Sequence, residues 1–144
     1  MCIGNRDGGD DAIGPYIADK LKDKEDDYNF VTLDCGTIPE NYTSVVKRYK
    51  TGKLLIIDAV EMGLDPGEIR IVPKEKISNM HISTHGIPIS VLIGYLEQYI
   101  KNIIFIGIQP KGMSGKITTC VKKNADKLIE KIIKNELEKV KTLR

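Results

Sequence analysis

The chain has 144 residues, of which 41% are hydrophobic and 29% are charged. This balance is typical of a globular protein, and the length suits one compact domain, residues 1–144, with too little left for a second. The formal net charge of only +2 gives no electrostatic reason to expect a nucleic acid or a lipid surface as partner. The longest apolar runs have the length of a strand, so we expect neither membrane insertion nor a signal peptide.

The cysteines Cys2, Cys35 and Cys120 are widely spaced and form no CxxC pair. An odd number without paired spacing favours reduced thiols over a disulfide framework and predicts a cytoplasmic protein. Cys35 could be imagined as a nucleophile acting with His85, but it follows an apolar stretch and has no neighbouring base. We therefore expect a buried structural thiol there.

The first part of the chain predicts a short strand, a glycine-rich loop and a helix. Residues 1–3 are too few for a normal first strand, so either that strand is a stub or the true start lies upstream. The loop GNRDGGDD (4–11) follows them. A helix is expected next, because apolar residues recur at helical spacing: Ile13, Ile17 and Leu21. Residues 30–33 predict a second strand, and residues 42–49 a short helix.

The middle of the chain predicts the centre of the sheet. Residues 54–57 are aliphatic without a break, which is typical of a strand covered on both faces, and the run stops at Asp58. The sequence LDPG at 64–67 is a strong turn signal. Residues 68–72 then alternate apolar with charged side chains, as an edge strand should.

The second half predicts two helices around another strand. Pro88 suits the start of a helix with an apolar stripe: Ile89, Leu92, Ile93, Leu96 and Ile100. Residues 103–108 predict a second doubly buried strand, and residues 111–116 a glycine-rich loop. The last helix is expected from Thr119 onward, with a core-facing set of Val121, Ala125, Leu128, Ile129, Ile132 and Leu137. This alternation predicts the α/β class, a three-layer α/β/α sandwich whose mostly parallel twisted sheet has about five strands and one antiparallel edge strand.

Polar side chains follow the predicted strands at one edge of this sheet. Ligands of open α/β sheets bind beyond the carboxyl ends of the strands, so the loops carrying Asp11, Asp58 and His85 are expected to meet there. Two oxygens and one nitrogen suit a borderline divalent ion such as nickel or zinc, with positions left open for water or substrate. Ordinary structural roles remain the alternative, since aspartates are common at strand ends and favourable in a first helical turn.

Other polar residues have weaker interpretations. Asp10 is expected to cap the first helix while Asp11 faces the site. His81 is expected to be a surface or packing residue. Glu61 either orients His85 or a backbone amide, or is a solvated loop carboxylate, and Gln109 is expected to line the cleft. Three residues are expected to fix loops and contact substrate: Asn5, Glu40 and Thr84.

Five blocks occur in fixed order along the chain: CIGNRDGGDDAIGP, DCGTIPEN, LLIIDAVEMGLDPGEIRI, STHGIPIS and IFIGIQP. Together they resemble the nickel–iron hydrogenase maturation endopeptidases, above all the type that serves formate-hydrogenlyase and related membrane-bound hydrogenases. The resemblance runs from Cys2 to about Leu128, and several blocks in order are far more specific than any one of them. Ala12 departs from it, because family members usually carry glycine there.

The resemblance implies an activity, a partner and a set of site residues. The activity is removal of a C-terminal extension from the hydrogenase large-subunit precursor after nickel insertion, so that precursor is the expected partner. Asp11, Asp58 and His85 are then the metal-binding and catalytic residues. The expected metal is nickel carried by the substrate, and zinc or cadmium could occupy the site in vitro.

Two other functions compete with this interpretation. A receiver-like phospho-acceptor domain would use a similar residue set, here Asp10, Asp11, Asp58, Thr84 and Lys111, but the glycine-rich loop, the DPGEIRI segment and His85 fit it poorly. A non-catalytic nickel or hydrogenase chaperone would keep the ligands without cutting the precursor.

Overall fold

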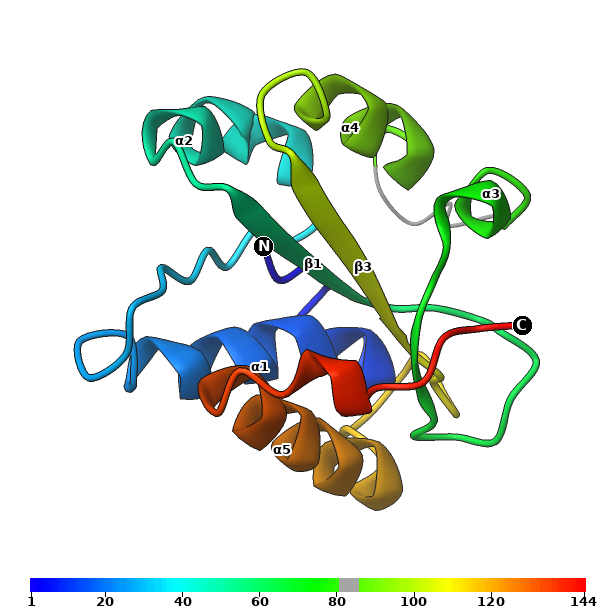
Figure 1. The fold of residues 1–144 in the computed structure, drawn as a ribbon. Coiled ribbons are helices and arrows are strands. Elements are labelled where there is room, and N and C mark those ends of the chain that lie inside the picture. The colour runs from blue at the N-terminus through cyan, green and yellow to red at the C-terminus, as the bar shows by residue number, and fades with distance from the viewer. Residues whose placement is uncertain (81–85) are drawn as a thin grey trace.

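The computed structural model describes residues 1–80 and 86–144, which form a sheet with helices on both faces (Figure 1). The sheet contains β1 (Lys53–Ala59), β2 (Ile69–Ile71) and β3 (Asn102–Ile108), in the spatial order β1-β3-β2. β1 and β3 pair in parallel, and β2 is antiparallel to β3. The predicted α/β class and the antiparallel strand are confirmed, although the described residues form three strands rather than about five.

Helices complete the layers on either side of the sheet (Figure 1). Two cover one face: α1 (Ile13–Lys22) and α5 (Thr119–Ile133). Three cover the other: α2 (Thr43–Arg48), α3 (Lys74–Ile77) and α4 (Ile89–Leu96). Short 3-10 turns precede or follow some of these helices along the chain: η1 (Gly9–Ala12), η2 (Pro39–Tyr42) and η3 (Leu137–Lys139). None of the described helices is both long and apolar enough to span a membrane.

Neighbouring residues of the two parallel strands contribute to opposite cores. Ile56 and Phe105 pack into the core under α2 and α4, whereas Ile57 and Ile106 pack into the core under α1 and α5. Side chains alternate across a strand, so an unbroken aliphatic run serves both cores at once. Burial of each such side chain contributes about 1.5–3 kcal/mol. The two cores therefore hold β1 and β3 rigidly in place and fix the edge at which β1 ends.

The N-terminal residues extend the sheet past β1 by single bridges. Cys2 bridges Ile57 on one side and Asp34 on the other. The prediction of a strand at residues 30–33 is wrong. None of these residues is in a strand, and the bridge to Cys2 is made by the next residue, Asp34. A one-residue partner cannot support a longer ladder, and the Thr32 N–H donates instead to a side chain, Glu25 Oε2, at 2.9 Å.

The C-terminal residues cover the outer edge of β2. Ile71 donates to the Lys141 oxygen at 2.8 Å and accepts from the Leu143 N–H at 2.8 Å. Thr142 thereby forms a parallel bridge with Ile71. These hydrogen bonds satisfy the backbone groups of Ile71, which an edge strand would otherwise leave unpaired, and the sequence did not predict this contact.

Candidate active site

Asp58 lies inside β1, one residue before the strand ends, and is 0% exposed. It stands opposite Gly107 in the parallel register with β3. The sequence predicted that this aspartate follows the strand. In the structure it is the second-last residue of β1 and is still paired with β3. Its position at the carboxyl end of a parallel strand is the place where α/β sheets bind ligands.

Asp11 lies in η1, which packs against β1, and is 4% exposed. Its Oδ2 accepts from the Asn5 N–H at 3.0 Å. Its Oδ1 is buried without a hydrogen-bond partner among the residues that the structure describes. The glycine-rich loop passes close to the backbone of Asp11, because a side chain at Gly4 would collide with the Asp11 carbonyl oxygen. The structure thus brings Asp11 and Asp58 to adjoining elements, both buried.

Asp10 makes different contacts from those expected of a helix cap. Its Oδ2 accepts from the N–H groups of Lys111 at 2.8 Å and Gly112 at 3.1 Å. Thr118 donates its N–H to Oδ1 at 2.6 Å and its hydroxyl to Oδ2 at 2.8 Å. Burial alone would raise the pKa of Asp10, but these hydrogen bonds to the ionised form lower it below the ordinary value. The capping prediction for Asp10 is wrong, because its carboxylate joins η1 to a distant loop.

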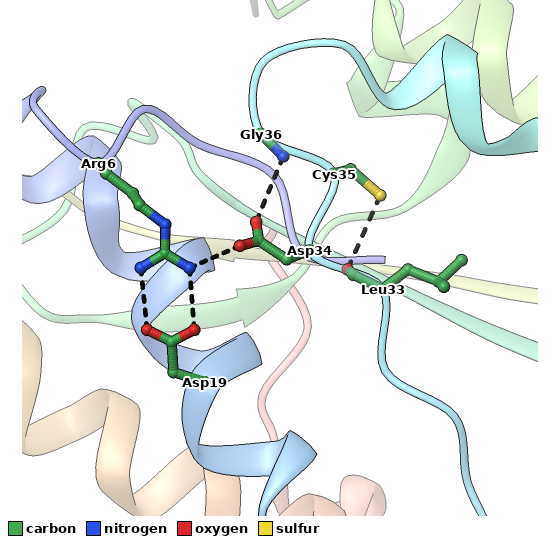
Figure 2. A network of polar contacts seen from close by, with 6 residues as sticks. All are labelled: Arg6, Asp19, Leu33, Asp34, Cys35 and Gly36. Carbon is green, nitrogen blue, oxygen red and sulfur yellow. Dashed lines mark hydrogen bonds and ion pairs between the residues drawn. The ribbon is translucent and has the colours of Figure 1, made fainter.

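Arg6 anchors the glycine-rich loop from outside (Figure 2). Its guanidinium donates to both oxygens of Asp19 on α1, at 2.9 and 2.8 Å, and to Asp34 Oδ2 at 2.6 Å. Hydrogen bonds from Arg6 lower the pKa of Asp19 and raise that of Arg6 itself. The side chains of Arg6 and Asp19 are more than half exposed, so this network orients the loop more than it stabilises the fold.

The third predicted ligand, His85, lies outside the described residues, as do His81 and Thr84. The first described residue after them is Gly86, where an added Cβ would lie 2.8 Å from Glu40 Oε1. Glu40 Oε2 is buried and has no hydrogen-bond partner in the described part of the chain. Within residues 1–80 and 86–144, no group of three His, Cys, Asp or Glu side chains could hold a metal ion.

Several lesser sequence predictions can be located in the structure. Glu61 is exposed, which fits a solvated loop carboxylate, and it also accepts from the Gly63 N–H at 2.9 Å, which fits the backbone-amide alternative. Asn5 fixes its own loop, because its Oδ1 accepts from the Asp7 N–H at 2.9 Å. Cys35 is buried, and burial raises the pKa of its thiol to about 12, as expected of a structural cysteine.

Gln109, which was expected to line the cleft, makes hydrogen bonds that the sequence did not predict. Its Oε1 accepts from the N–H groups of Met62 at 2.7 Å and Leu64 at 3.2 Å, and the residue is 3% exposed. It therefore shapes the segment that follows Asp58. The sequence signal for this role was its place at the end of β3, directly after a doubly buried strand. Thr118, the main partner of Asp10, was missed, because a threonine before a helix normally indicates a cap.

Comparisons with known proteins agree on one family. The family model described as "HycI: Hydrogenase maturation protease" matches residues 15–135. The hydrogenase 3 maturation protease of Escherichia coli K12 is 41% identical over 111 residues, covering 76% of this chain and 70% of the relative. A putative hydrogenase maturation protease of Methanocaldococcus jannaschii is 38% identical over 142 residues, covering 92% of this chain and 84% of the relative.

A solved structure supports the same assignment. The solution structure of the endopeptidase HycI from Escherichia coli superposes with a TM-score of 0.88 at 34% identity, covering 99% of this chain and 94% of the other. The likeness thus extends over the whole fold, including both aspartate-bearing elements. Sequence family, relatives and architecture converge, and the chain belongs to the hydrogenase maturation proteases, a family of peptide-bond hydrolases.

Proposed function

We propose that this protein removes the C-terminal extension of a nickel–iron hydrogenase large-subunit precursor after nickel has been inserted. Family membership supports the reaction type, and the name of the Escherichia coli relative, hydrogenase 3 maturation protease, supports the substrate class. In this proposal nickel arrives with the precursor and is part of the substrate. The wide spacing of the cysteines, without a CxxC pair, further supports a cytoplasmic reaction.

The observation that carries the proposal is the buried Oδ1 of Asp11, which has no hydrogen-bond partner among residues 1–80 and 86–144 and lies on an element adjoining the strand that carries Asp58. A carboxylate oxygen removed from water without a hydrogen bond is costly, and a divalent cation offsets that cost better than any neutral donor. Asp11, Asp58 and His85 together would supply an oxygen, oxygen, nitrogen donor set. That set suits nickel in vivo and zinc or cadmium in vitro.

The donor set would act on nickel that the precursor already holds. Completing its coordination would dock the tail of the precursor at the carboxyl end of β1, with the scissile peptide close to the ion. A cation at that place would polarise the peptide carbonyl or lower the pKa of an attacking water. Both roles require the same docking, so both predict that cleavage depends on nickel in the precursor.

The proposal is tested with purified large-subunit precursor, prepared nickel-loaded and nickel-free and incubated with the protein. Mass spectrometry of the product should show loss of a C-terminal peptide from the loaded form only. Equal cutting of both forms would contradict nickel recognition. Binding of the loaded form without cutting would favour the chaperone alternative, and phosphorylation of Asp58 by acetyl phosphate would favour the receiver alternative.

A further inference from the structure

The carboxylates of Asp10 and Asp11 are consecutive, yet they serve different surroundings. Asp10 is 0% exposed and its two oxygens accept four hydrogen bonds, all from residues 111–118. Asp11 accepts from within its own loop and keeps one oxygen unbonded among the described residues. A 3-10 turn has about three residues per turn, so adjacent side chains diverge widely. One carboxylate is therefore tied to the scaffold while its neighbour is left for another role.

The segment that Asp10 holds follows β3 at the edge where Asp58 lies. Residues 111–116 are exposed throughout, so little packing of their own fixes them. Besides the Asp10 carboxylate, the Asp10 N–H donates to the Gly112 oxygen at 2.9 Å. Gly9, with φ +61, lets the two segments touch, since a Cβ there would lie 2.7 Å from the Ser114 oxygen. The contact is a clamp between two loops far apart in sequence.

The hydroxyl of Thr118 is committed to this clamp. Thr118 is the N-cap residue of α5, but in the part of the chain that the structure describes its side chain makes no cap hydrogen bond to that helix. It donates to Asp10 Oδ2 instead, at 2.8 Å. Removal of the hydroxyl therefore weakens the clamp without taking a cap hydrogen bond from α5.

We propose that Asp10 is a positioning residue, whose carboxylate clamps residues 111–118 to the turn that carries Asp11 and so fixes the Asp11 carboxylate relative to Asp58. The inference rests on the role proposed above for Asp11. Asp10 itself does not touch the substrate, because every oxygen of its side chain is turned into the 111–118 segment. Loss of the clamp lets η1 shift, and a displacement of about 1 Å at a reacting group can cost about 100-fold in rate.

Asp10→Asn tests the clamp, because one carboxylate oxygen becomes an amide that faces backbone donors. We expect kcat for nickel-loaded precursor to fall roughly 10- to 100-fold, while KM is unchanged. Thr118→Val should lower kcat less than Asp10→Asn does. Thr118→Ser, which keeps the hydroxyl, should have the wild-type kcat. Asp126→Asn is the matched control, because Asp126 accepts from Tyr16 at 2.6 Å on the exposed face of α5. It should process precursor at the wild-type rate.

Two further readouts keep the test decisive. Circular dichroism at the assay temperature establishes that each variant is folded, and a loss of activity equal to the unfolded fraction overturns the proposal. Amide hydrogen exchange at residues 8–12 should speed up in Asp10→Asn but not in Asp126→Asn, and unchanged exchange also overturns it. If the wild-type protein cleaves the precursor and folded Asp10→Asn cleaves it equally well, this inference is wrong but the proposed function stands. If the wild-type protein cuts no precursor, the proposed function itself is wrong.

Discussion

Gly107 on β3 faces Asp58 on β1 across the parallel pair, and its missing side chain makes room for the segment that follows Asp58. A Cβ on Gly107 would lie 3.2 Å from Val60 Cβ and 3.1 Å from Met62 Sδ. Both separations are tighter than ordinary van der Waals contact. The shape of the loop beyond Asp58 thus depends on a glycine in the neighbouring strand.

Gly107→Ala should lower the free energy of unfolding by about 1–3 kcal/mol, because the added methyl overpacks a filled site. It should also slow precursor processing, since Val60 and Met62 must move. Urea denaturation measures the first effect. Gly94→Ala is the matched control. No atom of the described residues lies within 4 Å of a Cβ at this exposed helical position, so the substitution should stabilise α4 by about 1 kcal/mol. Equal free energies of unfolding for the two variants would show that Val60 and Met62 do not pack tightly against Gly107.

Gln109→Leu should destabilise the protein by about 1–3 kcal/mol, because it removes the acceptor for the Met62 and Leu64 N–H groups. Gln109→Glu keeps an acceptor oxygen and serves as the comparison. The midpoint of urea unfolding gives the difference, and faster amide exchange at residues 62–64 should accompany it. If exchange at those amides is the same in Gln109→Leu as in wild type, the side chain does not hold this loop.

Thiol labelling at pH 8 should modify Cys120 and spare the other two cysteines. Cys120 is exposed, whereas Cys2 and Cys35 are buried. Burial raises the pKa of both buried thiols, that of Cys35 to about 12, so almost no thiolate forms at this pH. Mass spectrometry after iodoacetamide treatment should show one adduct on the folded protein and three after unfolding. Rapid native labelling of Cys35 would reopen its role as a nucleophile.

The Tyr16 hydroxyl should lose its proton at a higher pH than an ordinary tyrosine does. Burial and the hydrogen bond to Asp126 raise its pKa from 10.0 to about 12. Because the folded value is the higher one, the stabilisation is complete below pH 10 and is lost as the pH rises from 10 to 12. Absorbance at 295 nm, taken as the difference between wild type and Tyr16→Phe, follows this residue. Asp126→Asn should lower the midpoint, and a wild-type midpoint near pH 10 would exclude the contact.

The local pattern of apolar residues predicted the strands that are buried on both faces and the helices that are buried on one face. The aliphatic runs at β1 and β3 and the stripes of α1, α4 and α5 indicated the right element types, because each periodicity reports a core directly. The strand predicted at residues 30–33 does not form, because the bridge that Cys2 makes on this side of the sheet is to Asp34, just beyond that range. A strand needs a neighbouring strand to pair with as well as an apolar pattern. The length of that neighbour cannot be predicted from the sequence of the strand itself.

The site was predictable only in part. Asp11 and Asp58 were assigned from loop position and family resemblance, and both are buried on adjoining elements. The partners of Asp10 could not be predicted, because they are 101 to 108 residues away and nothing in the local sequence of Thr118 distinguishes a clamp from a cap. His85 stays a prediction, since it lies outside the described residues.

We propose that Asp11, Asp58 and His85 act together on one nickel-bearing substrate. The most direct measurement is product mass after single-turnover incubation of nickel-loaded precursor with Asp11→Ala, Asp58→Ala and His85→Ala, each checked for native circular dichroism. Every folded variant should leave the precursor uncut, while the wild-type protein removes the extension. Normal cleavage by any one of the three would contradict it.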